Sequence, residues 1–90
     1  MGSDVQIKLL LFAAAKERAN GECERWLRLA SKWRNDHELR DYICTQSLPA
    51  LNEMKSTLAL AINEEYCVNC DSIELKNGDT VALIPPITGG

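Results

Sequence analysis

Alternating apolar and polar residues predict a strand near the start of the chain. The odd-numbered positions from 5 to 11 are all apolar, whereas Gln6 and Lys8 fall on the other face, as in a strand with one buried side. The second face becomes apolar further along, at Leu10 and Phe12. We therefore expect something to cover the far end of this strand.

Helix-forming residues occupy positions 13–19, and Asn20-Gly21 ends them with a turn signal. The segment that follows has two interpretations. A helical spacing of i, i+3, i+4 and i+7 relates Trp26, Leu29, Ala30 and Trp33. Read as a strand, residues 23–29 show only a ragged alternation. Periodicity alone slightly favours the helix.

A second helix is predicted from about residue 36. Asn35-Asp36 followed by Glu38 is typical of a helix start, with an Asx cap and acidic residues in the first turn. One apolar stripe follows, made by Leu39, Tyr42 and Ile43. The helix should stop near Ser47, because Pro49 disfavours helical geometry just before it.

Short strands and turns are predicted in the last third of the chain. Residues 58–62 alternate as an inner strand, 63–65 form a turn, and 66–68 begin a return strand. The tetrapeptide 76–79, Lys-Asn-Gly-Asp, is a strong tight-turn signal, and 80–84 is the last strand. This order predicts an α+β domain in which one main helix lies on a mixed sheet of four to five strands.

Composition narrows the classes of partner. The chain has 90 residues, enough for one domain, and is 46% hydrophobic and 26% charged, as in an ordinary globular protein. Its net charge is −3, so electrostatic attraction to nucleic acid or anionic lipid is not expected. An acidic protein is more suited to a basic cleft on a protein partner. We find no apolar run of the roughly 18 residues that span a membrane and no secretory signal, so we expect a cytosolic protein.

Four cysteines raise the question of a metal site or disulfides: Cys23, Cys44, Cys67 and Cys70. We expect them to be reduced and mostly buried. The last two have C-x-x-C spacing, but a structural zinc ion needs two more ligands, and His37 stands alone. We therefore predict no metal and keep a redox pair as a less favoured alternative. Trp26 and Trp33 are expected to be packing residues.

The last six residues carry the most specific chemistry in the chain, with the sequence Pro85-Pro86-Ile87-Thr88-Gly89-Gly90. Two prolines cannot continue a ladder and project the chain as a stiff spacer, whereas two glycines make a thin, flexible tip. Such a tip can enter a narrow tunnel and present its carboxylate. Once activated, for example by adenylation, that carboxylate can become a thiocarboxylate or form an isopeptide with an amine. The plain alternative is a frayed end.

Three segments resemble MoaD-type molybdopterin synthase small subunits, which are ubiquitin-like β-grasp proteins. Residues 78–90 are similar to that family's C-terminal pattern, in which Pro-Pro precedes the last four residues. Residues 7–13 and 61–66 are similar to its first and third strands, whereas residues 22–56 depart from its pattern. The resemblance implies a β-grasp domain over residues 1–84 and an extended tail over residues 85–90. It also implies a strand before the main helix, so we favour the strand for residues 23–29.

The same resemblance implies a function. An E1-like activating enzyme would use ATP to adenylate Gly90, and a sulfurtransferase step would give the thiocarboxylate. The carrier would dock on the large catalytic subunit, in a 2:2 heterotetramer, and donate sulfur to the cyclic pyranopterin precursor (precursor Z). This chain would then be the sulfur-donor subunit of an enzyme. It would have no acid–base catalytic residues of its own and no permanently bound cofactor.

The resemblance also implies contact residues. Phe12 and Ile84 fall on the faces of their strands opposite the helix-packed core, and Tyr66 matches a position where the family places an interface residue. The three are expected to form one apolar patch that docks the large subunit, with a small second core as the alternative. Lys16 is a candidate contact for the activating enzyme, or simply part of a solvated turn.

Three other functions stay open. One is a sulfur carrier for thiamine synthesis or tRNA thiolation, whose tails lack Pro-Pro. The second is a ubiquitin-like protein modifier that forms isopeptides through the same carboxyl group. The third is a binding domain with an inert tail, or a small cysteine metal module.

Overall fold

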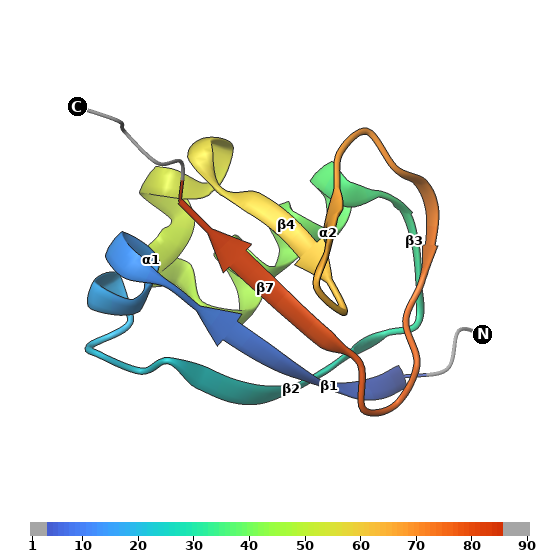
Figure 1. Ribbon diagram of the computed structural model, residues 1–90, viewed down its shortest axis with the longest axis horizontal. Coiled ribbons are helices and arrows are strands. Elements are labelled where there is room, and N and C mark those ends of the chain that lie inside the picture. Colours follow the sequence, from blue (N-terminus) through green and yellow to red (C-terminus); the bar gives the residue numbers. More distant parts are fainter. Residues whose placement is uncertain (1–3, 86–90) are drawn as a thin grey trace.

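A computed structural model describes residues 4–85 of the chain, and strands and helical segments both contribute to one domain (Figure 1). In chain order the elements are β1 (Asp4–Leu11), α1 (Ala13–Arg18), β2 (Glu24–Ala30), β3 (Lys32–Asn35), α2 (Asp36–Tyr42), η1 (Ile43–Ser47), η2 (Pro49–Thr57), β4 (Ala59–Ile62), β5 (Glu65–Cys67), β6 (Asp71–Glu74) and β7 (Thr80–Ile84). The segment η1 is a π-helical turn and η2 is a 3₁₀ helix.

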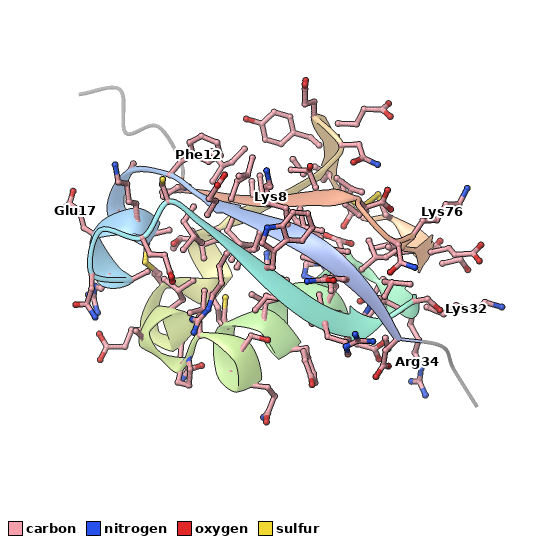
Figure 2. The ribbon with its side chains drawn as sticks, turned by 90° about the horizontal axis from the view of Figure 1, so that it is seen from below. Lys8, Phe12, Glu17, Lys32, Arg34 and Lys76 are labelled. Atoms are coloured by element: carbon pink, nitrogen blue, oxygen red, sulfur yellow. A yellow bond between two sulfur atoms is a disulfide. The ribbon has the colours of Figure 1, made fainter. Side chains whose placement is uncertain are left out.

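Five of the strands form a mixed sheet in the order β2-β1-β7-β4-β5. Only β1 and β7 run parallel within it, with Leu11 opposite Leu83, and the other pairs are antiparallel. The segments α2, η1 and η2 lie together on one face, below the strands in Figure 2. Among the described residues, the helical layer therefore covers one face of the sheet and leaves the other without a covering element.

The core lies between the sheet and the helical layer. From the sheet, the predicted inner face of β1 is buried, with Ile7 and Leu9 fully inaccessible to solvent. From the helical layer, Leu39, Ile43 and Leu51 belong to the same buried cluster. The alternation predicted for the first strand is confirmed, and burial of these side chains is the main source of stability.

The main helix begins with two side-chain to backbone hydrogen bonds. The Asn35 side chain accepts a hydrogen bond from the Glu38 amide at 2.8 Å, and the Glu38 carboxylate accepts one from the Arg34 amide at 3.1 Å. The predicted Asx cap is thus Asn35, not Asp36. Helical geometry continues through η1 and ends at Ser47, as Pro49 predicted.

Residues 24–30 form a strand, so the helical periodicity seen there is misleading. Strand β2 pairs with β1 along its whole length, from Asp4 opposite Ala30 to Leu10 opposite Glu24. The hydrogen bonds of this ladder outweigh a weak local preference. Trp33 packs against the core and donates its indole N–H to the Ala30 carbonyl at 2.7 Å.

A second, two-stranded sheet was not predicted from the sequence. Strands β3 and β6 pair antiparallel, with Trp33 opposite Ile73. Both strands are only four residues long and lie far apart in the chain. Neither has enough residues for a clear alternation, so the pairing is visible only in three dimensions.

The tight turn predicted at residues 76–79 places β7 beside β1. Gly78 has a φ of +89°, a conformation that glycine adopts without strain. The Lys76 amide donates to the Asp79 carboxylate at 2.8 Å, and the Gln6 amide of β1 donates to the Asn77 side chain at 2.9 Å. These bonds fix the turn against the first strand and confirm the prediction.

Asp36 is a buried carboxylate, only 6% exposed, and its side chain accepts a hydrogen bond from the Cys70 amide at 3.0 Å. We expect Asp36→Ala to lower the free energy of unfolding by about 2 kcal/mol, because the partly buried Cys70 amide would lose a charged acceptor. Urea denaturation measures the change. Asp36→Asn keeps an acceptor oxygen and should cost less than half as much. Equal losses in the two variants would contradict this role for the hydrogen bond.

Candidate functional site

No element of residues 4–85 covers the face of the sheet away from the helices, and this face is largely apolar along its centre. Lys8 and Phe12 project from this face in Figure 2, on the opposite side of the strands from the helical segments. Because side chains alternate along a strand, Leu10 shares this face with them, while Leu9 and Leu11 point into the core. We call this uncovered surface the outer face.

The strand register assigns two rows of residues to the outer face. The first row crosses the sheet through Leu10, Ala82, Ala61 and Tyr66. The second row lies two residues further along β7 and contains Phe12, Ile84, Ala59 and Val68, of which Phe12 and Val68 lie just beyond the paired residues. The alanines form a shallow floor between larger side chains at either side. Such a surface can accept apolar side chains of a partner.

The three residues predicted to form a docking patch do share the outer face. Phe12 is 46% exposed and Tyr66 is 65% exposed, whereas Ile84 is half-buried. Tyr66 lies two strands away from β7, with β4 between them, so the three residues are the borders of one surface and not a tight cluster. Val68, 69% exposed, belongs to the same surface and was not predicted.

Trp26 extends the apolar surface onto β2. It was expected to be a packing residue, but it is 53% exposed, so that prediction is wrong. The register places it beside Lys8, whose ammonium lies 5.3 Å from the centre of a Trp26 ring and 3.8 Å from the Glu24 carboxylate. An exposed aromatic ring under a lysine amine is held in place by a cation–π contact. If residues 24–30 had been paired with the first strand from the sequence alone, Trp26 would have been placed opposite Lys8 on the outer face.

The root of the tail lies at the same end of the sheet as Phe12. Because β1 and β7 run parallel with Leu11 opposite Leu83, both strands finish at this end, and Pro85 follows directly. Lys16 of α1 is exposed and borders an open hollow of about 420 Å³ together with Phe12. The remaining predicted tail residues, which are Pro86, Ile87, Thr88, Gly89 and Gly90, lie outside the described residues.

The cysteines differ from the sequence-based expectation. Cys67 and Cys70 form a disulfide, so the prediction that all four are reduced is wrong. Cys23 is free and exposed, whereas Cys44 is free and fully buried. Burial raises the pKa of the Cys44 thiol to about 11, which keeps it protonated and unreactive at neutral pH.

Residues 4–85 offer neither a metal site nor a membrane-spanning helix. No group of three or more histidine, cysteine, aspartate or glutamate side chains there could hold a metal ion. Within the same residues, every helix is too short or too polar to cross a bilayer.

Solved structures place this architecture in the ubiquitin-like β-grasp fold, as the family resemblance implied. The solution structure of the small archaeal modifier protein 1 from Methanosarcina acetivorans superposes with a TM-score of 0.72 at 22% identity, covering 99% of this chain and all of that one. A complex of subunits 1 and 2 of the molybdopterin-converting factor from Helicobacter pylori gives a TM-score of 0.63 at 24% identity, covering 96% of this chain and 100% of the matched one.

Sequence comparison then identifies the family. The ThiS family matches residues 9–90, and the chain belongs to it. The chain is 38% identical over 86 residues to the molybdopterin synthase sulfur carrier subunit of Chlamydomonas reinhardtii, covering 96% of this chain and 100% of that protein. It is 39% identical over 88 residues to the protein of the same name from Arabidopsis thaliana, with coverages of 98% and 86%. The resemblance seen in three segments is thereby confirmed over nearly the whole chain.

Proposed function

We propose that this chain is the sulfur carrier subunit of a molybdopterin synthase. The observation that carries the proposal is the similarity to sulfur carrier subunits over nearly the full length of the chain. The match to the ThiS family also runs to the end of the chain and includes Gly89 and Gly90. An uncovered apolar face beside the root of the tail supports it, because a carrier must dock on the enzyme that its tail enters.

The working group in this proposal is the carboxyl group of Gly90. A carboxylate resists attack by nucleophiles, so an E1-like enzyme first joins it to the AMP part of ATP and releases pyrophosphate. A sulfur donor then displaces AMP and leaves a thiocarboxylate. Transfer of that sulfur to the pyranopterin precursor, precursor Z, returns Gly90 to the carboxylate form. ATP is thus a reactant of the activating enzyme and not a cofactor of this chain.

In this proposal the outer face binds the large subunit, and the tail spans the distance from the sheet to the active site. The six residues from Pro85 onward can span at most roughly 20 Å when extended. Docking must therefore bring the large subunit's active site within that distance of the end of β7. Phe12 and Ile84 lie at that end of the sheet, so a partner seated on them is correctly placed. We propose a 2:2 assembly with this large subunit, in the cytosol.

Acid–base catalysis is assigned to the partner. The outer face presents apolar side chains and a Lys8–Glu24 ion pair, and the buried charged residue found among residues 4–85, Asp36, belongs to α2 on the other side of the sheet. The chemistry of the outer face fits recognition better than proton transfer. Lys16 is exposed near the root of the tail and keeps its proposed role as a contact for the activating enzyme.

The intact mass of the protein tests this function. After incubation with the activating enzyme, ATP and a sulfur source, we expect a gain equal to one replacement of oxygen by sulfur, mapped to Gly90. Samples without ATP and a variant lacking Gly90 should show no gain. An unchanged mass with an activating enzyme that thiolates another carrier would overturn the proposal. Lysine-linked adducts that require Gly90, without a thiocarboxylate, would instead identify a protein modifier.

A further inference from the structure

Strand β5 ends in a cysteine whose disulfide closes the loop that follows. Cys67 is the last residue of β5, and Cys70 comes just before β6, so the bond closes the loop between the two sheets. Their Cα atoms lie 5.7 Å apart, within the range that disulfides span. The proposed sulfur-carrier function makes no use of this pair.

The disulfide is open to attack from solvent. Both cysteines border an open surface hollow of about 310 Å³, which is also lined by Tyr66 and Asn63. Cys67 is 8% exposed and packs with the core, whereas Cys70 is only partly buried. An incoming thiolate therefore meets the Cys70 sulfur more readily than the Cys67 sulfur.

The bond lies at the weakest part of the sheet. Strand β5 is an edge strand of three residues, paired with β4 only through residues 65–67. Beyond the disulfide, the loop is anchored by the hydrogen bond from the Cys70 amide to the Asp36 carboxylate, at 3.0 Å. That second anchor holds Cys70 but not β5. Without the disulfide, the end of β5 is tied to the domain by few contacts, and local opening becomes easier.

The residues beside Cys67 belong to the outer face. Cys67 points into the core, so Tyr66 and Val68 on either side of it point outward. They are the most exposed of the large apolar residues among residues 4–85, at 65% and 69%. The disulfide thus lies directly beneath one border of the surface that we assign to docking.

We propose that Cys67 and Cys70 form a thiol–disulfide exchange site, and that its oxidised form holds Tyr66 and Val68 in place for the large subunit. The substrate class of the site is a dithiol reductant. Its effect on docking rests on the proposed function, whereas the exchange chemistry and the change in β5 do not.

The exchange conserves atoms and electrons. One thiolate of the dithiol attacks the Cys70 sulfur, which forms a mixed disulfide and releases Cys67 as a thiolate that takes up a proton. The second thiol of the reductant loses its proton and attacks its own sulfur in the mixed disulfide. Cys70 then leaves as a thiolate and is protonated. Two electrons and two protons pass to the cysteine pair, and the reductant becomes a cyclic disulfide.

The other two cysteines do not compete for this exchange. Cys44 is fully buried and its thiol remains protonated at neutral pH. Cys23 is exposed but borders a different hollow, beside Phe12 and Lys16. The pair is therefore expected to react as an isolated unit.

Thiol counting and hydrogen exchange test the site without any partner. The full chain, oxidised and then unfolded, should show two titratable thiols, and four after treatment with dithiothreitol. In the native state, reduction should speed amide exchange of residues 65–68 by about fivefold, while β1 is unchanged. If the chain still showed four titratable thiols after incubation with an oxidised dithiol, the disulfide would not form and the proposal would be overturned. Identical exchange of residues 65–68 in the two forms would also overturn it.

Docking is measured with the purified large subunit and each redox form under anaerobic conditions. We expect the reduced form to bind about fivefold more weakly, because the partner must then order β5 at the cost of binding free energy. The variant Cys67→Ser/Cys70→Ser should bind like the reduced form in both conditions, and Cys23→Ser should respond like the unmodified chain. Equal affinities of the two forms would overturn the regulatory role. If neither form binds while thiol counts and exchange behave as expected, the exchange site stands and the proposed function fails.

Discussion

Replacing Phe12 with aspartate is expected to weaken binding of the large subunit by about 100-fold. Phe12 is 46% exposed on the outer face and stands next to the root of the tail, where a docked partner must cover it. Loss of a buried aromatic anchor at an interface costs about 3 kcal/mol, and an unpaired carboxylate in an apolar contact adds a desolvation penalty. Titration calorimetry or surface binding with the purified large subunit measures the change.

A matched variant separates docking from a general effect of charge. Ala50→Asp adds the same charge at an exposed position of η2, on the covered side of the sheet, and should bind normally. Phe12→Asp should unfold at nearly the same urea concentration as the unmodified chain, because an exposed side chain contributes little to the core. If Phe12→Asp bound within threefold of the unmodified chain, the outer face near Phe12 could not be the docking surface.

Replacing Leu9 with alanine is expected to lower the free energy of unfolding by about 3 kcal/mol. Leu9 is fully buried at the centre of the core, and alanine would leave a cavity between β1 and the helical layer. A domain of this size has only about 5–15 kcal/mol of total stability, so the loss is severe. The melting temperature should fall by roughly 15 °C in a thermal scan.

Its neighbour Leu10 provides the control, because it carries the same side chain on the opposite face of the same strand. Leu10 is half-buried among outer-face residues, so Leu10→Ala should cost about 1 kcal/mol or less. The same change should weaken docking about fivefold, whereas Leu9→Ala should leave the affinity of the folded fraction unchanged. Similar losses of stability in the two variants would contradict the assignment of an inner and an outer face.

Features with a short-range cause were predicted well from the sequence. The first strand follows from alternation at positions 5–11, and the turn at 76–79 follows from the need for a residue with positive φ at Gly78. The end of the main helix follows from Pro49. In each case the signal that predicts the element lies within a few neighbouring residues of the chain.

Features that depend on contacts between distant parts of the chain were not predicted from the sequence. Trp26 looked like a packing residue because its spacing to Leu29 and Trp33 is helical, and only the pairing of β2 with β1 places it on the outer face. The β3–β6 sheet joins segments far apart in the chain. The disulfide depends on the loop that brings Cys67 and Cys70 together, which C-x-x-C spacing permits but does not require. Val68 was also missed, because only the pairing of β5 with β4 places its side chain on the outer face.

The position of β7 in the sheet has a consequence for how the domain forms. The pair β4–β5 is a tight hairpin and the pair β1–β2 is joined through α1, so a growing chain can form both early. Isolated two-stranded units of this kind are at best marginally stable in water. Only β7, which lies between them, joins the two into one sheet. Its pairing with β1 closes a loop that contains nearly the whole chain, so we expect this step to limit the folding rate. The strand that leads into Pro85 is thus the last to pair, so Pro85 is correctly placed only in a chain whose sheet has already assembled.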